Sequence, residues 1–324
     1  MNVFITGGSG FLGQMVIRKL IADGHNIGAL ARTDSSAIVV EKLGAKPIMG
    51  DITSVERFSN KLSEFDAVVH CAAPVEFWGQ WAKYQQSIID STISLAYECA
   101  KQNVKRFIHI SSESVLQNTS NLLDINEDFS YPDEPNSYYG KAKKITEEQL
   151  LKTTGKMDII ILRPSYIWGA SSPSFTTITQ KVKSGQFMWI DQGKNSFEAV
   201  HVENVAEAVR LSLTAGKNRS IYFVTDDENS SVREFFESLF KSLGLQTPTM
   251  SVPGGLLRPV ASLVERIWKL LNIKEKPPIS RFDLAFVAMP RRYNIDRIKT
   301  ELGYRPIISR AMGFEQLHAS LQAR

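Results

Sequence analysis

The sequence is poor in cysteine and has no grouping of residues that would bind a metal. Only Cys71 and Cys99 occur among its 324 residues, outside any CxxC or zinc-site spacing, and the five histidines include no HExxH pair. We therefore expect no metal site. Both cysteines lie in apolar runs, which predicts small buried side chains in a protein of a reducing compartment.

Long apolar runs are also missing. No stretch of roughly 18 or more apolar residues occurs, and the N-terminal MNVFITGG has no basic region followed by an apolar one. A signal peptide needs such a basic start. We therefore expect neither a transmembrane segment nor a signal peptide, and the cytoplasm is the expected location.

Neither sign of charge dominates the chain. It has 38 basic and 34 acidic residues, interspersed, for a net charge of +4. Nucleic-acid-binding proteins gather basic residues in a patch or stripe, so we expect no nucleic-acid partner. The length and a hydrophobic fraction of 43% allow a large core without disulfides, which excludes disordered and disulfide-scaffold classes.

Short β-branched apolar runs alternate with helical periodicity over the first 165 residues. The expected strands are 3–5, 27–31, 47–49, 67–72, 107–111 and 159–162. The expected helices are 12–21, 54–64, 81–103 and 137–154. This alternation predicts an α/β fold, a Rossmann doubly wound parallel sheet with helices on both faces.

A glycine-rich segment, TGGSGFLG at 6–13, follows the first strand and opens the first helix. Gly7 permits the tight turn, Gly10 lets the backbone approach a pyrophosphate, and Gly13 allows close helix–sheet packing. The free N–H groups of the helix start would bind the phosphates. We predict a dinucleotide site here that includes Phe11 and Leu12; the alternative is a glycine-rich turn without a ligand.

The rhythm changes after residue 165. A short strand pair near 187–190 and 197–202, a helix at about 203–215, a strand at 221–225 and a mostly helical tail from 231 follow. We assign 1–165 to the NAD(P)-binding Rossmann domain, completed by segments at about 200–225. The remainder, 166–199 and 226–324, is predicted to form a smaller, interleaved C-terminal substrate lobe.

Several motifs occur in an order that resembles one known family. Besides TGxxGxxG they are GD at 50–51, HCAAPV at 70–75, VKRFIHISS at 104–112, YGKAK at 139–143, RPSYIWG at 163–169, HVENVAEA at 201–208 and LGYRP at 302–306. Together they resemble the extended short-chain dehydrogenase/reductase (epimerase/dehydratase) superfamily across the whole chain. Within it the chain is most similar to the 3β-hydroxysteroid dehydrogenase-like branch, which includes bacterial reductases of long-chain β-keto acids.

Tyr139 and Lys143 lie one helical turn apart, and an ammonium beside a phenol lowers its pKa. The resemblance implies that Tyr139 exchanges the proton with the substrate and that Lys143 also binds the nicotinamide ribose. It selects Ser112, three residues before Val115, to hold the substrate oxygen. The alternatives are a chance surface pair and a serine that caps a turn.

The end of the second strand informs the choice of cofactor. NAD-selective relatives have an acid where this chain has Ala31, and the next residue, Arg32, can pair with a 2′-phosphate. We therefore favour NADP, and NAD stays possible through Asp34. Asp51 resembles the residue that contacts the adenine. We also assign to the cofactor site Ile52, Ala72, Ala73, Pro164 and Ile167.

Aromatic residues indicate where the substrate binds. Phe77, Trp78 and Trp81 follow the fourth strand on the side where the substrate should lie, and Tyr166 and Trp168 complete the predicted set. Core packing would produce the same pattern. A set of apolar residues at helical spacing, 256–271, is best explained by packing on the second lobe, with a lid or a membrane-surface face as alternatives.

One position departs from the family pattern. Alignment through Thr92 and Val104 places Ile88 where the family has an asparagine that holds a water beside the lysine. Isoleucine cannot hold that water, so the proton route past Lys143 is uncertain. Ser87 and Ser91 are the candidate substitutes.

These residues predict an NADP(H)-dependent oxidoreductase that interconverts a ketone and a secondary alcohol on a small hydrophobic molecule, sterol-like or long-chain β-keto. A nucleotide-sugar epimerase or dehydratase is the first alternative, which Arg291 and Arg292 keep open as diphosphate ligands. A non-catalytic dinucleotide sensor is the second, although it has no need of a proton donor. A homodimer is left open.

Overall fold

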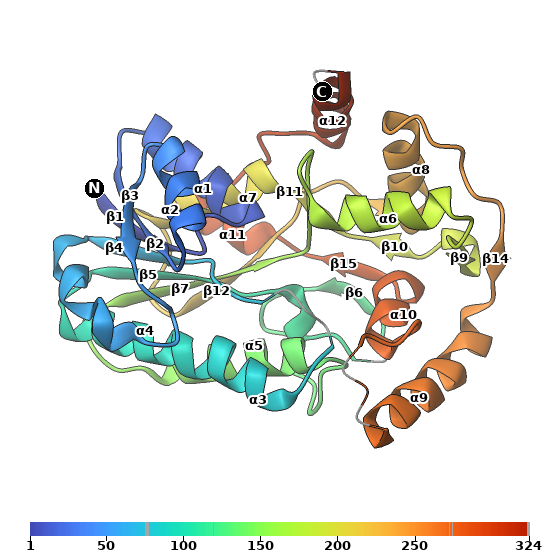
Figure 1. Ribbon diagram of the computed structural model, residues 1–324, viewed down its shortest axis with the longest axis horizontal. Coiled ribbons are helices and arrows are strands. Elements are labelled where there is room, and N and C mark those ends of the chain that lie inside the picture. Colours follow the sequence, from blue (N-terminus) through green and yellow to red (C-terminus); the bar gives the residue numbers. More distant parts are fainter. Residues whose placement is uncertain (75–77, 119, 272, 274, 323–324) are drawn as a thin grey trace.

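A seven-stranded parallel sheet forms the centre of the protein (Figure 1). The structure, a computed structural model, describes residues 1–74, 78–118, 120–271, 273 and 275–322. The sheet order is β12-β7-β5-β4-β1-β2-β3. Its strands are β1 (Asn2–Thr6), β2 (Asn26–Ala31), β3 (Lys46–Met49), β4 (Ala67–His70), β5 (Arg106–Ile110), β7 (Asp158–Pro164) and β12 (Ser220–Val224). The predicted α/β doubly wound fold is confirmed.

The strand order reverses between β1 and β4, because the chain runs outward through β2 and β3 and then restarts on the other side of β1. Ligands of open α/β sheets bind beyond the carboxyl ends of the strands at such a reversal. The fold therefore places its crevice next to the turn that leaves β1.

Helices cover both faces of the sheet, which is why its strands are apolar throughout rather than alternating. Side chains of β1 divide between the two faces: Val3 and Ile5 join one core cluster, and Phe4 joins the other. On the first face α1 (Phe11–Ala22) packs against α7 (Val202–Ser212). The second face is covered by α4 (Ser91–Lys101) and α5 (Tyr138–Lys152).

Two predicted helices differ in detail. The segment 54–64 forms two short 3₁₀ helices, Val55–Arg57 and Ser59–Glu64. Its serines and asparagine compete for backbone hydrogen bonds and disfavour a continuous α-helix. The segment 81–103 is divided into α3 (Trp81–Tyr84), a π-helical stretch (Gln85–Asp90) and α4. A π-helical turn shifts the side chains that follow it and is frequent at functional sites.

Short two-stranded sheets connect the rest of the chain. They pair β6 (Leu122–Ile125) with β15 (Arg291–Tyr293), β8 (Tyr166–Trp168) with β11 (Ala199–His201), β9 (Trp189–Ile190) with β14 (Ser251–Val252) and β10 (Ser196–Phe197) with β13 (Ser230–Ser231). The expected pairing of 187–190 with 197–202 is wrong. Asp191, Gln192 and Gly193 all have positive φ, and this turn directs the chain away from β9.

The C-terminal part of the chain is mainly helical. Its helices are α6 (Pro173–Lys183), α8 (Val232–Ser242), α9 (Gly254–Leu270), α10 (Arg281–Ala288), α11 (Asp296–Leu302) and α12 (Arg310–Gln322). The remaining helix, α2 (Asp34–Lys42), belongs to the N-terminal part and follows β2. Within the described residues, no helix is long and apolar enough to cross a membrane. β12 lies at the edge of the main sheet beside β7. The boundary between a dinucleotide domain and a substrate lobe stays a prediction.

An aromatic core holds this part together. Trp168, Phe175, Trp189, Phe197 and Phe235 are buried in one cluster. Trp168, one of the predicted substrate residues, is buried in this cluster. Its burial favours a packing role, and its contact with substrate stays a prediction.

A buried ion pair fixes α5 to the sheet. The Arg163 guanidinium of β7 donates to the Glu147 carboxylate at 2.6 Å and 3.1 Å, and neither side chain is more than 1% exposed. The Tyr131 hydroxyl donates to the same carboxylate at 2.7 Å. Removing one partner would leave the other charge buried without compensation.

We expect Glu147→Gln to destabilise the protein by about 3 kcal/mol or more, because the Arg163 charge would remain in the core. Urea unfolding followed by circular dichroism measures this change. Glu148→Gln, at the next and partly exposed position, is the control and should change stability by less than about 0.5 kcal/mol. Equal stability of the two variants would show that the ion pair does not hold α5 in place.

Candidate active site

The glycine turn at the end of β1 is sterically closed to other residues. Gly7 has φ +72°, and a Cβ on Gly7 would lie 2.8 Å from the Ala72 backbone nitrogen. A Cβ on Gly13 would lie 2.1 Å from the Gly7 carbonyl oxygen. The turn therefore sits directly against the chain that leaves β4.

The start of α1 has free hydrogen-bond donors. Its N-cap, Gly10, offers no side-chain hydrogen bond, and the first turn of the helix has no acidic residue. The amide of Gly10 donates to the Gly7 carbonyl at 3.0 Å. The N–H groups of the first turn and the positive end of the helix dipole fit a pyrophosphate.

A chain of hydrogen bonds joins the ends of β1 and β4. Thr6 Oγ1 and His70 Nδ1 are 2.7 Å apart, and His70 Nε2 lies 2.9 Å from Thr92 Oγ1. The Ala72 amide donates to Thr6 Oγ1 at 3.3 Å. Burial, reinforced by the Lys143 charge, lowers the pKa of His70 to about 3, so the imidazole stays neutral and serves as a link. Sequence reasoning missed these residues, although polar groups at adjacent strand ends are a detectable signal.

Ser112, Tyr139 and Lys143 come together beyond the carboxyl end of β5. Ser112 follows β5 directly and accepts a hydrogen bond from the Ser114 amide at 3.2 Å. Its side chain also hydrogen-bonds Tyr139. Lys143, one turn further along α5, donates from Nζ to the Ile110 carbonyl at 2.6 Å. Ser112 therefore both caps the turn that follows β5 and interacts with Tyr139, so the two roles considered for it do not exclude each other.

Burial dominates the electrostatics of this group. It raises the pKa of Tyr139 to about 12, and the hydrogen bond with Ser112 opposes that shift. It lowers the pKa of Lys143 to about 8, against the opposing effect of Glu147. The expected lowering of the phenol pKa by Lys143 is thus not observed, and the effect that opposes burial comes from Ser112. Tyr139 keeps its proton at neutral pH.

Ile88 forms an apolar wall next to Tyr139. It is buried within the π-helical stretch and clusters with Tyr84, Tyr139 and Ala142. The two candidate substitutes for the family asparagine are already engaged, because Ser87 donates to the Lys83 carbonyl and Ser91 donates to the Ser87 carbonyl at 2.9 Å. Both hydroxyls are thus committed as donors and can only accept from a water, so their role as substitutes stays a prediction.

The predicted adenosine end lies at the termini of β2 and β3. Arg32 follows β2 and is exposed, and Asp34 begins α2. Asp51 follows β3 and accepts from the Thr53 amide and hydroxyl at 2.9 Å and 2.8 Å. These bonds lower the pKa of Asp51, and the Arg32 charge adds to the effect.

The remaining cofactor candidates line the ends of other strands. Ala72 and Ala73 follow β4, Pro164 ends β7, and Ile167 lies in β8 and packs on the first core cluster. Ile52 packs on the second cluster. Their roles stay predictions.

The predicted substrate residues are dispersed. Phe77 lies outside the described residues. Trp78 donates from Nε1 to the Ile273 carbonyl at 3.4 Å. Trp168 has no exposed surface and donates to Asp226 at 2.7 Å, whereas the Tyr166 ring contacts Phe197 and other members of the aromatic core. These contacts favour packing roles for Tyr166 and Trp168.

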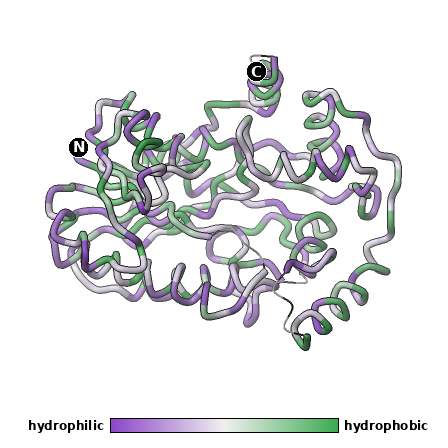
Figure 2. Tube along the Cα trace, viewed as in Figure 1, coloured by the Kyte–Doolittle hydropathy of each residue, from purple (hydrophilic) through white to green (hydrophobic). Residues whose placement is uncertain are grey.

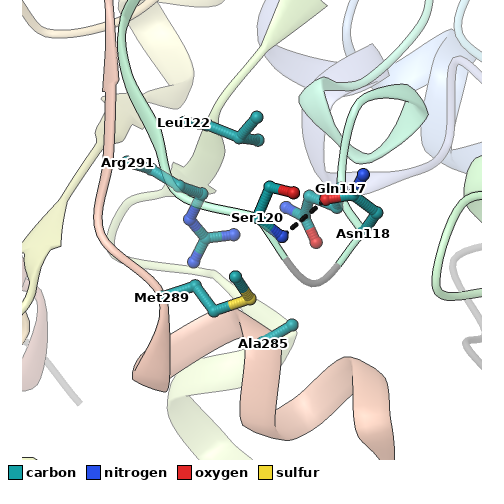
Figure 3. A pocket seen from close by; sticks show the side chains of 7 residues that line it. All are labelled: Gln117, Asn118, Ser120, Leu122, Ala285, Met289 and Arg291. Carbon is teal, nitrogen blue, oxygen red and sulfur yellow. Dashed lines mark hydrogen bonds between the residues drawn. The ribbon is translucent and has the colours of Figure 1, made fainter. Parts of the chain in front are cut away.

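A small cavity lies between the segment that follows Ser112 and α10 (Figure 3). It is lined by Gln117, Asn118, Ser120, Leu122, Ala285, Met289 and Arg291. Arg291 is buried, pairs with Glu113 at 3.4 Å and donates to the Phe286 carbonyl. Its neighbour Arg292 pairs with Asp124. Both arginines are therefore already neutralised by carboxylates.

Comparison with known proteins gives consistent matches over the chain. Residues 4–253 match the model of a family described as the 3-beta hydroxysteroid dehydrogenase/isomerase family. A sterol-4-alpha-carboxylate 3-dehydrogenase (decarboxylating) from Dictyostelium discoideum is 32% identical and covers 98% of this chain and 99% of its own. A 2-alkyl-3-oxoalkanoate reductase from Stenotrophomonas maltophilia is 26% identical over the full length of both chains, a coverage of 100%.

Solved structures agree on the fold. The crystal structure of gox2253 superposes with a TM-score of 0.82 at 24% identity and covers 99% of this chain and 98% of its own. A UDP-glucose 4-epimerase from Thermotoga maritima has a TM-score of 0.79 at 20% identity, with 100% and 99% coverage. At these identities the likeness concerns the fold alone.

Proposed function

The chain belongs to the 3-beta hydroxysteroid dehydrogenase/isomerase family, and we propose that it is an NADP(H)-dependent oxidoreductase that interconverts a ketone and a secondary alcohol on a hydrophobic substrate. The observation that carries this proposal is the hydrogen-bonded pair of Ser112 and Tyr139, with Lys143 one turn away. The sterol dehydrogenase and oxoalkanoate reductase names of its relatives support it.

The glycine turn after β1 and the ends of β2 and β3 fit a nicotinamide dinucleotide. The turn at Gly7 and the free N–H groups at the start of α1 would hold the pyrophosphate, and Asp51 would contact the adenine. Lys143 would hydrogen-bond the nicotinamide ribose. When bound, the nicotinamide supplies or accepts the hydride.

Tyr139 is suited to be the proton donor in the reducing direction. Its raised pKa keeps the phenol protonated, and the Ser112 hydroxyl lies where it can hold the substrate oxygen beside it. Charge that develops on that oxygen would be stabilised by both hydroxyls and by the ammonium of Lys143. A dinucleotide sensor would have no use for this arrangement.

A hydrophobic substrate fits better than a nucleotide sugar. A diphosphate needs free cations, and Arg291 and Arg292 are paired with Glu113 and Asp124. Releasing either arginine would leave a carboxylate unpaired, which costs free energy for the buried Glu113 in particular. We therefore propose a sterol-like or long-chain β-keto substrate.

The state of the cysteines supports a reducing compartment, and we place the protein in the cytoplasm. Both are free thiols, and Cys99 is buried while Cys71 is partly exposed. The surroundings of Cys71 remove most water from its sulfur and raise the pKa of the thiol to about 12, so it stays protonated and is a weak nucleophile at neutral pH.

Tyr139→Phe should lower turnover at least about 100-fold, because it deletes the proton donor and keeps the ring. The affinity for NADPH should stay within about two-fold, since the phenol proton is not a cofactor anchor. Steady-state rates and fluorescence titration with NADPH give the two values. Tyr138→Phe, at the adjacent exposed position, should match the unmutated protein in both. A Tyr139→Phe rate above a tenth of normal would remove Tyr139 from the acid–base role.

Arg32→Ala should weaken NADPH binding about 10- to 100-fold and leave NADH binding unchanged, because a charge-assisted contact with the 2′-phosphate contributes about 1.5–3 kcal/mol. Calorimetric titration with both cofactors measures the preference. Arg18→Ala, which removes an exposed arginine of α1, should change neither affinity. NADH binding as tight as NADPH in the unmutated protein would assign the enzyme to NAD instead.

Steroid ketones and long-chain β-keto acids should oxidise NADPH at concentrations where UDP-sugars and GDP-sugars have no effect. Apolar burial contributes roughly 25 cal/mol per Å² to the binding of such ketones before the costs of association. A competition assay read by NADPH absorbance compares the two classes. Tight binding of a nucleotide sugar, with no response to any lipophilic ketone, would move the protein to the epimerase or dehydratase class.

A further inference from the structure

The helix α9 has a stripe of exposed apolar side chains along its whole length. Leu256, Val260, Leu263, Ile267 and Leu270 are 68%, 47%, 58%, 40% and 84% exposed. At 3.6 residues per turn these positions fall within an arc of about 80°. Figure 1 places α9 at the edge of the molecule, and Figure 2 shows hydrophobic residues recurring along it.

The stripe is not the packing face of the helix. α9 packs against α10 through the opposite side, where Ala261 is fully buried and Glu265 is 6% exposed. The Glu265 carboxylate accepts from the Arg281 amide and guanidinium at 2.6 Å and 2.9 Å. The packing predicted from sequence therefore explains one face of α9 and leaves the apolar stripe, Leu256 to Leu270, uncovered.

The charges around the stripe are mainly positive. Arg266 is exposed, lies about 80° around the helix from the centre of the stripe, and forms no ion pair with any described residue; Arg258 is also exposed but lies about 160° from that centre, on the side of Glu265. The stretch 254–283 contains six basic and three acidic residues, in a chain whose net charge is +4. Since Glu265 is turned inward and paired with Arg281, the outer side of α9 combines the apolar stripe with the Arg266 cation at its edge.

We propose that α9 binds the surface of an anionic lipid bilayer, with the apolar stripe in the interface and Arg266, at the edge of the stripe, near the headgroups. Helices that lie in a membrane interface combine such an apolar face with basic residues. The attraction of a cation to an anionic leaflet adds to the burial of the stripe. The proposal does not depend on the reaction assigned above, because it concerns only the outer surface of α9.

A second copy of the chain is a less suitable occupant. The helix is about 25 Å long, so a stripe roughly 10 Å wide covers about 250 Å². A stable protein interface buries about 800 Å² on each partner. An anionic lipid surface also complements the Arg266 cation at the edge of the stripe.

The end of α9 contacts a segment that leads toward the predicted active site. Just beyond its end, the Ile273 carbonyl accepts the hydrogen bond of Trp78, which follows β4 near the glycine turn. A bilayer in contact with α9 would thus lie beside a segment that leads to the predicted active site. A lipophilic molecule could pass from lipid to protein without crossing water.

Vesicle flotation tests the proposal with the full-length protein. Vesicles of phosphatidylcholine with half phosphatidylglycerol should carry the unmutated protein at low salt, and raising the salt to about 1 M should release much of it. Leu263→Glu/Ile267→Glu should reduce binding more than ten-fold. The control, Ile38→Glu/Met312→Glu, changes two equally exposed apolar residues elsewhere and should bind normally. Thermal unfolding of all variants should be alike, because every changed side chain is exposed.

Arg266 is tested separately. Arg266→Gln should weaken binding to the anionic vesicles about five-fold, and Arg258→Gln, on the opposite side of α9, is the control and should bind normally. Binding to pure phosphatidylcholine should not change. Absence of vesicle binding by the unmutated protein, or equal binding by Leu263→Glu/Ile267→Glu, would overturn the proposal. Sedimentation that shows a dimer lost in Leu263→Glu/Ile267→Glu, without vesicle binding, would assign the stripe to a second copy instead.

Discussion

A single buried carboxylate links the fold to the active site. Glu147 accepts the guanidinium of Arg163 on one side and, one turn along α5, opposes the loss of charge from Lys143. Without this carboxylate, burial would lower the pKa of Lys143 further, and α5 would lose its attachment to β7. The ammonium that serves the site and the ion pair that positions the helix therefore depend on the same residue.

The same constraint explains why Lys143 points as it does. Desolvation favours a neutral amine, so a buried lysine remains charged only where oxygen atoms surround it. The Ile110 carbonyl, at the end of β5, supplies one of them at 2.6 Å. The end of a parallel strand thus provides both the crevice and the acceptor that the lysine needs.

Much of this arrangement could be predicted from the sequence. Runs such as Phe107–Ile110 are too short and too β-branched for helices, and each became a strand of the main sheet, buried except at the edge strand β3. The glycine turn followed from a steric need that no other residue meets. The four-residue spacing of Tyr139 and Lys143 placed them on one face of α5. In each case the feature depends on residues close together in the chain, which is why the sequence pattern predicts it.

What could not be predicted depends on contacts between distant segments. The raised pKa of Tyr139 results from burial by the π-helical stretch, whose register no local signal gives. The pairing of Arg291 with Glu113 joins residues far apart in sequence. The sequence therefore shows that Arg291 is charged, but it does not show whether that charge is free to bind a diphosphate. The covering of α9 could not be predicted either. Periodicity shows that a helix has an apolar face, but it does not show which part of the protein or which partner covers that face.

The two faces of α9 then follow from one sequence pattern. A helix with apolar residues on opposite sides can bury only one of them against its own protein. Ala261 and Glu265 fix that choice, because the Glu265 carboxylate can be buried only where Arg281 meets it. The ion pair therefore sets the rotation of α9 about its axis, and the apolar stripe is turned outward as a consequence. A lipid surface would bury the outer apolar stripe of α9, as the main sheet buries the apolar face of α5.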